Sequence, residues 1–212
     1  MMHPNCQVKT VDDQVGVGVF ATAFIPAGTV VYVEDPLDIV IPPDSPLLEN
    51  PVLRPTIDKY AILEPGQRRV IGWDAAKYVN HCCHANIIST GYGFEIALRD
   101  ILPGEELRDE YALFNLGWTM ELNCHQTEGC RGVLRPDDFE RYCPVWDAQI
   151  QVALRQVMDV PQPLWPLLDE ATREAVRRYA NTGEGYQSVA ALKMGAGTAV
   201  PPTTNDTAVL PH

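Results

Sequence analysis

The sequence predicts an α+β protein that is mainly β up to about residue 135 and helical beyond it. In the first part, short runs rich in Val, Ile, Phe and Tyr alternate with Pro and Gly, a pattern typical of short strands joined by tight turns. After Pro144, apolar residues recur three and four positions apart, the period of an amphipathic helix. At 212 residues the chain can form one core, or one core with a small appendage.

The strands are expected in two blocks. Residues 15–40, VGVGVFATAFIPAGTVVYVEDPLDIV, predict two or three short strands with a tight turn at 26–28. Residues 94–113, FEIALRDILPGEELRDEYAL, predict a strand, a Pro-Gly turn and a second strand. Between them, residues 42–66 contain six prolines and little periodicity, which indicates a surface insertion with at most one short helix.

Two helices are expected in the last third of the chain, over residues 145–158 and 163–183. In the second, Asp169 and Glu170 come early and Gly183 follows the end, an arrangement that suits a helix dipole and a C-cap. Residues 195–212 are polar and rich in small residues and predict a flexible tail.

Charge and hydropathy exclude several classes of protein. The formal net charge of −12 and the pI near 4.7 argue against direct nucleic-acid binding and favour basic partners. No segment approaches the ~20 apolar residues that cross a bilayer, and the first ten residues lack the apolar core of a signal peptide. We therefore expect an intracellular protein, cytoplasmic by default and with a nuclear location open, whose six cysteines are thiols or metal ligands.

The stretch KYVNHCCHANI, residues 77–87, carries two adjacent cysteines between histidines and asparagines. These groups suit a zinc site, a cysteine nucleophile, a disulfide or a hydrogen-bonding platform for a cofactor. No set of acyl-transfer partners accompanies the cysteines, which disfavours the nucleophile. The stretch alone does not decide between the others.

Three segments taken in order resemble the SET-domain protein lysine methyltransferases. GVGVFATAFIPAGTVVYVE resembles the family's opening G-x-G segment, AAKYVNHCCHAN its N-H-S-C-x-P-N signature, and EIALRDILPGEELRDEYALF its G-E-E-L-x-x-D-Y signature. CHQTEGCRGVL resembles a shortened post-SET segment. The chain departs from these patterns at four positions: Cys82 stands for serine, Ala85 for proline, Arg108 for threonine and Glu110 for aspartate.

The resemblance implies a fold of several small β-sheets around a threaded pseudoknot, followed by a C-terminal helical appendage. On this basis residues 1–122 form the SET domain, with a variable insertion at 42–70. Residues 123–143 form a post-SET-like segment, 144–194 a helical region and 195–212 the tail.

The implied activity is methyl transfer from S-adenosylmethionine to a lysine side chain of a protein. The cofactor-binding residues implied are Gly16, Val17, Gly18, Val19, Asn80, His81 and Tyr111. In the family pattern, backbone of the glycine segment approaches the cofactor, Asn80 binds its methionine end, and the backbone of His81 contacts its adenine. Tyr111 is the implied catalytic residue, which orients the amine through its hydroxyl. The glycines could instead form only a bulge or turn, Asn80 and His81 could only brace the crossing, and Tyr111 could be an ordinary core tyrosine.

Zinc is the second group that the resemblance raises, with Cys83, Cys124 and Cys130 as ligands. His125 could complete a tetrahedral set, and Cys143 could serve as a spare ligand. The family's C-x-C-x4-C spacing is lost here, which argues against a bound metal.

The substrate remains open at this point. A basic protein or peptide fits the acidic chain and the acidic cluster Glu105, Glu106, Asp109 and Glu110, although such a cluster is also an ordinary solvated face. A free amino acid or another small amine is an alternative substrate, and an inactive SET-type binding module is an alternative function. Channel or adenine-stacking walls are expected from Tyr78, Phe114 and Trp118, although core packing suits each equally well.

Overall fold

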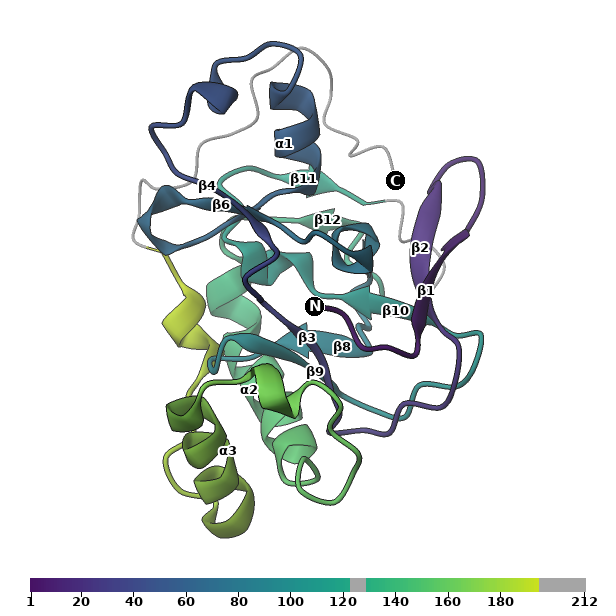
Figure 1. Ribbon diagram of the computed structural model, residues 1–212, viewed down its shortest axis with the longest axis vertical. Coiled ribbons are helices and arrows are strands. Elements are labelled where there is room, and N and C mark those ends of the chain that lie inside the picture. The colour runs from purple at the N-terminus through teal and green to yellow at the C-terminus, as the bar shows by residue number, and fades with distance from the viewer. Residues whose placement is uncertain (123–128, 195–212) are drawn as a thin grey trace.

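The computed structural model describes residues 1–122 and 129–194. Figure 1 shows a body of short strands, with α1 at one end of the molecule and α3 at the other. This arrangement confirms the predicted α+β class, with several small sheets in place of one large one. The predicted tail and the first part of the post-SET-like segment lie outside the described residues.

Within the described residues the strands form four sheets. Their orders are β1-β2-β10-β7, β3-β9-β8, β4-β6-β5 and β11-β12. The strands are β1 (Cys6–Thr10), β2 (Val17–Ala21), β3 (Val30–Val33), β4 (Ile39–Ile41), β5 (Ile62–Leu63), β6 (Arg69–Ile71), β7 (Asn80–His81), β8 (Ile87–Ser89), β9 (Phe94–Ala97), β10 (Glu106–Asp109), β11 (Met120–Glu121) and β12 (Val133–Leu134).

The two predicted strand blocks are confirmed. The first block forms β2, β3 and β4, and its turn contains Gly28 at φ 84°. The second forms β9 and β10, joined through Gly104, also at φ 84°. Both glycines adopt the left-handed conformation that residues with a Cβ rarely adopt.

The helices are α1 (Arg54–Tyr60), α2 (Asp138–Leu154) and α3 (Glu170–Thr182), together with short 3-10 turns that include η3 (Ala75–Tyr78) and η4 (Tyr111–Phe114). The Asp169 side chain caps α3 by accepting from the backbone N–H of Thr172 at 2.9 Å. Gly183 ends the helix in the left-handed conformation. Both predicted signals of this helix are confirmed.

Three sequence expectations were wrong in part. The helix expected over residues 163–183 begins only at Glu170, after a 3-10 turn at Trp165–Leu167. Strand β5 lies within the proline-rich stretch, where only a short helix was expected. Helix α2 starts at Asp138, six residues before Pro144, and so enters the predicted post-SET-like segment. Proline removes one backbone donor, but Phe139 and Trp146 pack edge to face on either side of it, with ring centroids 6.0 Å apart. This packing fixes the first turns of the helix in the core.

The main core joins the C-terminal helices to the strands. Trp146, Ile150 and Leu154 of α2 belong to the same buried cluster as Ile88 and Phe94 of the β3-β9-β8 sheet. The helical region is therefore packed onto the first part of the chain. A second cluster, formed by residues such as Val19, Ile87 and Leu107, lies between this sheet and the β1-β2-β10-β7 sheet.

The contact that builds the site joins β7 to β10, two short parallel strands. Asn86 extends this contact: its Nδ2 donates to the Glu106 carbonyl at 2.8 Å, and its Oδ1 accepts from the Arg108 N–H at 2.8 Å. The NHCCHAN segment is thereby fixed along the GEELRDEY strand. None of the helices in the described part of the chain is long and apolar enough to span a bilayer.

Candidate active site

Asn80 links the NHCCHAN segment to the opening glycine segment. Its Nδ2 donates to the Val17 carbonyl at 3.0 Å and to Glu106 Oε1 at 2.8 Å. Both amide hydrogens are thus used inside the protein. The Oδ1 atom accepts no hydrogen bond from any described residue, so it remains free to accept one from a ligand.

Gly18 permits this close approach. A Cβ at this position would lie 2.4 Å from Glu106 Oε1 and 2.9 Å from Asn80 Nδ2. The glycine is therefore required because three strands meet with no room for a side chain. Its neighbour Val19 is fully buried in the core, so only the backbone of that residue is available to a ligand.

His81 uses its side chain to hold Tyr111. The Tyr111 backbone N–H donates to His81 Nδ1 at 3.1 Å, and His81 Nε2 lies 3.4 Å from Cys83 Sγ. Burial, with a smaller effect of Arg131, lowers the pKa of His81 to about 3. The imidazole is therefore neutral at physiological pH, with its proton on Nε2.

Tyr111 begins η4, and only Glu110 separates it from the end of β10. Its hydroxyl donates to the Val79 carbonyl at 2.6 Å. Burial, and then the charges of Asp109, Glu95 and Glu106, raise the pKa of Tyr111 above its ordinary value. The phenol thus keeps its proton, and that proton is directed at Val79. The oxygen can then act toward a ligand as an acceptor.

A pocket of about 500 Å³ opens beside Tyr111. Phe114 and Trp118 line it, as predicted for channel walls. Tyr78 does not line this pocket: it packs against the second core cluster, the alternative given for it, and its ring meets Tyr60 edge to face with centroids 5.7 Å apart. Helix α1, part of the predicted insertion, supplies one wall.

The acidic cluster is not the exposed rim that the sequence suggested. Glu106, Asp109 and Glu110 are buried, with 8%, 1% and 2% of their surface exposed. Because strand β10 is covered on both faces, alternation does not send these carboxylates to solvent. Glu106 pairs with Arg108 at 2.7 Å, so Arg108, the residue in place of threonine, neutralises one of these buried charges.

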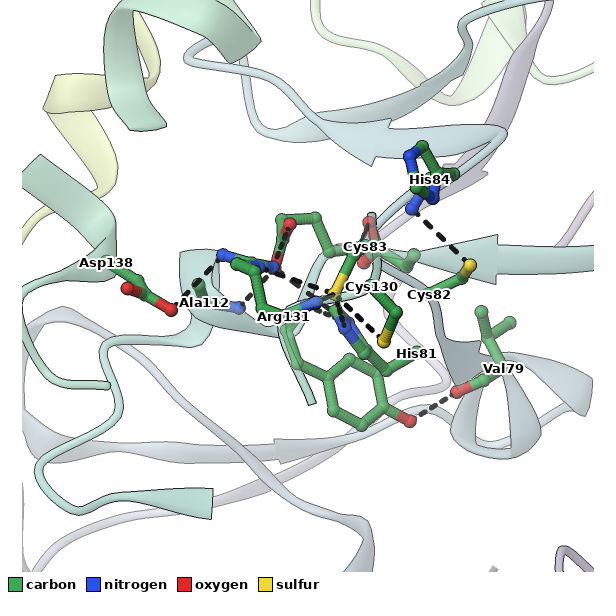
Figure 2. Close-up of polar contacts among 12 residues, drawn as sticks. Val79, His81, Cys82, Cys83, His84, Ala112, Cys130, Arg131 and Asp138 are labelled. Atoms are coloured by element: carbon green, nitrogen blue, oxygen red, sulfur yellow. Dashed lines mark hydrogen bonds and ion pairs between the residues drawn. The ribbon is translucent and has the colours of Figure 1, made fainter. Parts of the chain in front are cut away.

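Arg131, which follows Glu110 by 21 residues in the sequence, forms an ion pair with it. Its Nη2 donates to both Glu110 oxygens, at 2.7 and 2.6 Å, and its Nη1 donates to Asp138 Oδ2 at 3.2 Å. Its backbone N–H and its Nε both lie 3.4 Å from Cys83 Sγ. Figure 2 shows the guanidinium between Asp138 of α2 and the His81–Cys83 segment. One side chain thus joins α2, the NHCCHAN segment and the residue that precedes Tyr111.

These residues occur in one recognised domain. The model of the SET domain matches residues 16–112, which include the glycine segment, Asn80, His81 and Tyr111. Residues 16–112 form a SET domain. No protein of curated function matches the chain. SET domains occur in methyltransferases that generally use S-adenosylmethionine.

The residues of this SET domain fit the cofactor. S-adenosylmethionine carries an ammonium group, and Asn80 Oδ1 is an acceptor that the described residues leave open. The backbone of Val17 and Gly18 lies against Asn80, with no side chain from Gly18 in the way. The backbone of β7 carries His81 alongside. The predicted cofactor residues therefore lie together.

The predicted zinc ligands are only partly described. The sulfurs of Cys83 and Cys130 lie 3.8 Å apart, close to the spacing of two thiolates on one tetrahedral zinc ion. Cys124 and His125 lie outside the described residues, and residues 1–122 and 129–194 hold no group of three metal-binding side chains. Cys143, the suggested spare ligand, instead lies 3.8 Å from Asp147 Oδ2.

Three features of the site were not predicted from the sequence. The Val79 carbonyl positions the Tyr111 hydroxyl, but a backbone acceptor has no sequence signal. Arg131 lies in the post-SET-like stretch CHQTEGCRGVL, where no sequence signal singles it out. Glu95 lies in the otherwise apolar strand FEIA and lines the pocket. A lone acid in a strand that is buried on both faces is a signal that could have been used.

Proposed function

We propose that the chain is an N-methyltransferase that moves the methyl group of S-adenosylmethionine to the side-chain amine of a lysine in a protein. The observation that carries this proposal is the position of Tyr111. Its backbone is held by His81 of the cofactor-side segment, and it lines the pocket on the other side. A narrow boundary between two binding regions is what an in-line transfer requires.

When bound, S-adenosylmethionine supplies the methyl group as an electrophilic sulfonium. The role of the protein is to align the substrate amine with this methyl group. Because the Tyr111 hydroxyl proton is committed to Val79, its oxygen accepts an N–H of the amine and turns the nitrogen lone pair toward the methyl carbon. Phe114, Trp118 and the remaining apolar lining exclude water.

The amine must be neutral to react. A free lysine has a pKa near ~10.4 and arrives as an ammonium ion. Desolvation in the pocket and the neighbouring sulfonium charge both favour loss of its proton. The high pKa of Tyr111 means that its own hydroxyl does not become the base.

A basic protein segment is the proposed substrate. The net charge of −12 favours such a partner in solution. The buried acids of β10 do not contribute an exposed surface for it, so the preference rests on the overall field. A small free amine is the competing substrate, because the pocket could hold one without a protein attached.

Intact-mass analysis tests the proposal. Basic peptides, free lysine and other small amines are incubated with labelled S-adenosylmethionine and the protein. We expect added mass in steps of one methyl group on peptide lysines, and a much lower rate with Asn80→Ala, which loses a cofactor acceptor. Label on the small amines alone would refute the protein substrate. Failure of the folded wild-type protein to label any amine would refute the activity.

A further inference from the structure

Two buried carboxylic acids line the same pocket as Tyr111. Glu95 on β9 and Asp109 on β10 line this pocket and expose 8% and 1% of their surface. They come from different sheets, and Tyr111 and Val79 line the same pocket with them. Nothing in the resemblance to the family assigned a role to either acid.

These two acids differ from the other acids of the pocket. Asp58 pairs with Arg54 at 2.6 Å, and Glu64 pairs with Arg68. No lysine or arginine in the described part of the chain forms an ion pair with Glu95 or Asp109. Asp109 Oδ1 accepts only the Glu110 backbone N–H, at 2.7 Å. A buried carboxylate without a cation is costly, so a cation from outside would stabilise this pair.

Burial and neighbouring negative charge raise the pKa of both acids. Burial raises the pKa of Asp109 to about 7. Burial, and then the charge of Asp109, raise the pKa of Glu95 well above its usual range. Two carboxylates in one apolar site do not both ionise easily. Near neutral pH the pair therefore holds a proton and one negative charge.

Several charged groups surround the two acids, and the largest effect on the pKa of each acid is burial. On β3, Tyr32 faces Glu95 across the strands and donates its hydroxyl to Asp38. The Met1 ammonium is paired with Asp35 at 2.6 Å. Beside Asp109, the carboxylates of Glu106 and Glu110 are paired with arginines, and His81 is neutral. Three cationic side chains line the pocket: Lys59, Arg69 and Lys77. Lys77 donates to the backbone carbonyls of residues 72–74.

We propose that Glu95 and Asp109 form the cation-binding end of the substrate pocket and accept the proton that the substrate amine must lose. This role rests on the proposed methyl transfer. An ammonium proton moves to the singly charged pair, which leaves a neutral amine and a neutral pair of carboxylic acids. The nitrogen lone pair then bonds to the methyl carbon, the C–S bond breaks, and its electrons remain on sulfur. The product is a methylated ammonium ion.

A pocket of low dielectric constant favours this proton transfer. An ammonium and a carboxylate that meet away from water lose the solvation that keeps both charged. When their proton affinities are comparable, the neutral pair is favoured, and the sulfonium nearby penalises a second cation further. Tyr111 then holds the neutral amine by its oxygen, while the acid pair holds the proton.

Isosteric variants test the pair without emptying its space. Glu95→Gln, Asp109→Asn and the double variant keep shape and remove charge, and Glu170→Gln on the surface of α3 is the matched control. In the first measurement, n-butylammonium and 1-butanol are titrated into each protein and followed by NMR. We expect wild type and Glu170→Gln to bind the cation more tightly than the alcohol, and the double variant to lose that preference.

The second measurement is the pH profile of kcat on the amine identified by mass analysis and on its aminoethylcysteine analogue, which is less basic. Asp109→Asn should lower kcat for lysine by about 100-fold at neutral pH. The deficit should shrink at higher pH and with the analogue, which a merely structural loss would not do. Circular dichroism and cofactor binding should match wild type.

Two results would overturn the proposal. One is equal binding of n-butylammonium by wild type and the double variant. The other is an unchanged pH profile and an unchanged preference for lysine in both single variants. If wild type methylates no amine, the proposed function fails, and the n-butylammonium titration alone then decides whether the pair binds a cation.

Discussion

Arg131 has several polar partners close to Tyr111. It contacts Glu110, Asp138 and Cys83. Burial alone would lower the pKa of this guanidinium, but Glu110 raises it above its ordinary value. Arg131 therefore stays charged, and it fixes the backbone that leads into Tyr111.

Replacing this arginine should destabilise the fold strongly. Arg131→Met leaves Glu110 and Asp138 buried without their main cation, and we expect a loss of about 3 kcal/mol or more in the free energy of unfolding. Arg173→Gln, which breaks an exposed pair with Glu170, should cost under about 1 kcal/mol. Urea unfolding measures both. Equal small losses would show that the buried network contributes little.

Asp109 should make stability depend on pH in an unusual direction. Its pKa rises from 3.8 in the unfolded chain to about 7 in the folded one. As pH rises from about 4 to about 7, the unfolded state loses this proton first, so the free energy of unfolding falls. Glu95 acts in the same direction.

Asp109→Asn should therefore flatten part of this decline. We expect the variant to gain stability over wild type as pH rises through this range, as measured by urea unfolding at a series of pH values. A constant difference between the two proteins at every pH would mean that Asp109 is already ionised in the fold.

At the level of elements, α2 is the segment on which the SET-domain strands depend. Leu154 is fully buried in the main core, whereas Val152 is 60% exposed on the same helix. Leu154→Ala should cost about 2–5 kcal/mol, because it leaves a cavity between the helix and the β3-β9-β8 sheet. Val152→Ala should change stability by less than about 0.5 kcal/mol. Thermal unfolding in one transition for both variants would confirm a shared core, and a separate transition for the helices would contradict it.

Sequence patterns predicted these elements unevenly. The strands β2, β3, β9 and β10 are five or fewer residues long, but they have apolar runs and glycine turns that mark them. Strands β7 and β5 have two residues each and carry no periodic signal. Their existence depends on the partner strand, which is a tertiary contact. Pro144 was misleading for the same reason, since core packing outweighs its local effect.

At the level of the whole molecule, the site was predictable as a set of residues but not as an arrangement. Gly18, Asn80, His81 and Tyr111 were named from order and resemblance. Their contacts were not: Asn80 binds Val17 and Glu106, and His81 binds the Tyr111 backbone. The acids of β10 were expected at the surface because spacing alone does not reveal that both faces of a strand are covered.

The proposed methyl transfer requires that the cofactor side and the substrate side of the molecule meet at Tyr111. The most direct measurement is therefore single-turnover methyl transfer by wild type, Tyr111→Phe and the control Tyr186→Phe, whose hydroxyl binds Asp147 away from the pocket. We predict that Tyr111→Phe folds, binds S-adenosylmethionine as wild type does, and transfers methyl about 10- to 1,000-fold more slowly. Tyr186→Phe should retain the wild-type rate. A Tyr111→Phe protein with an unchanged rate would contradict the account.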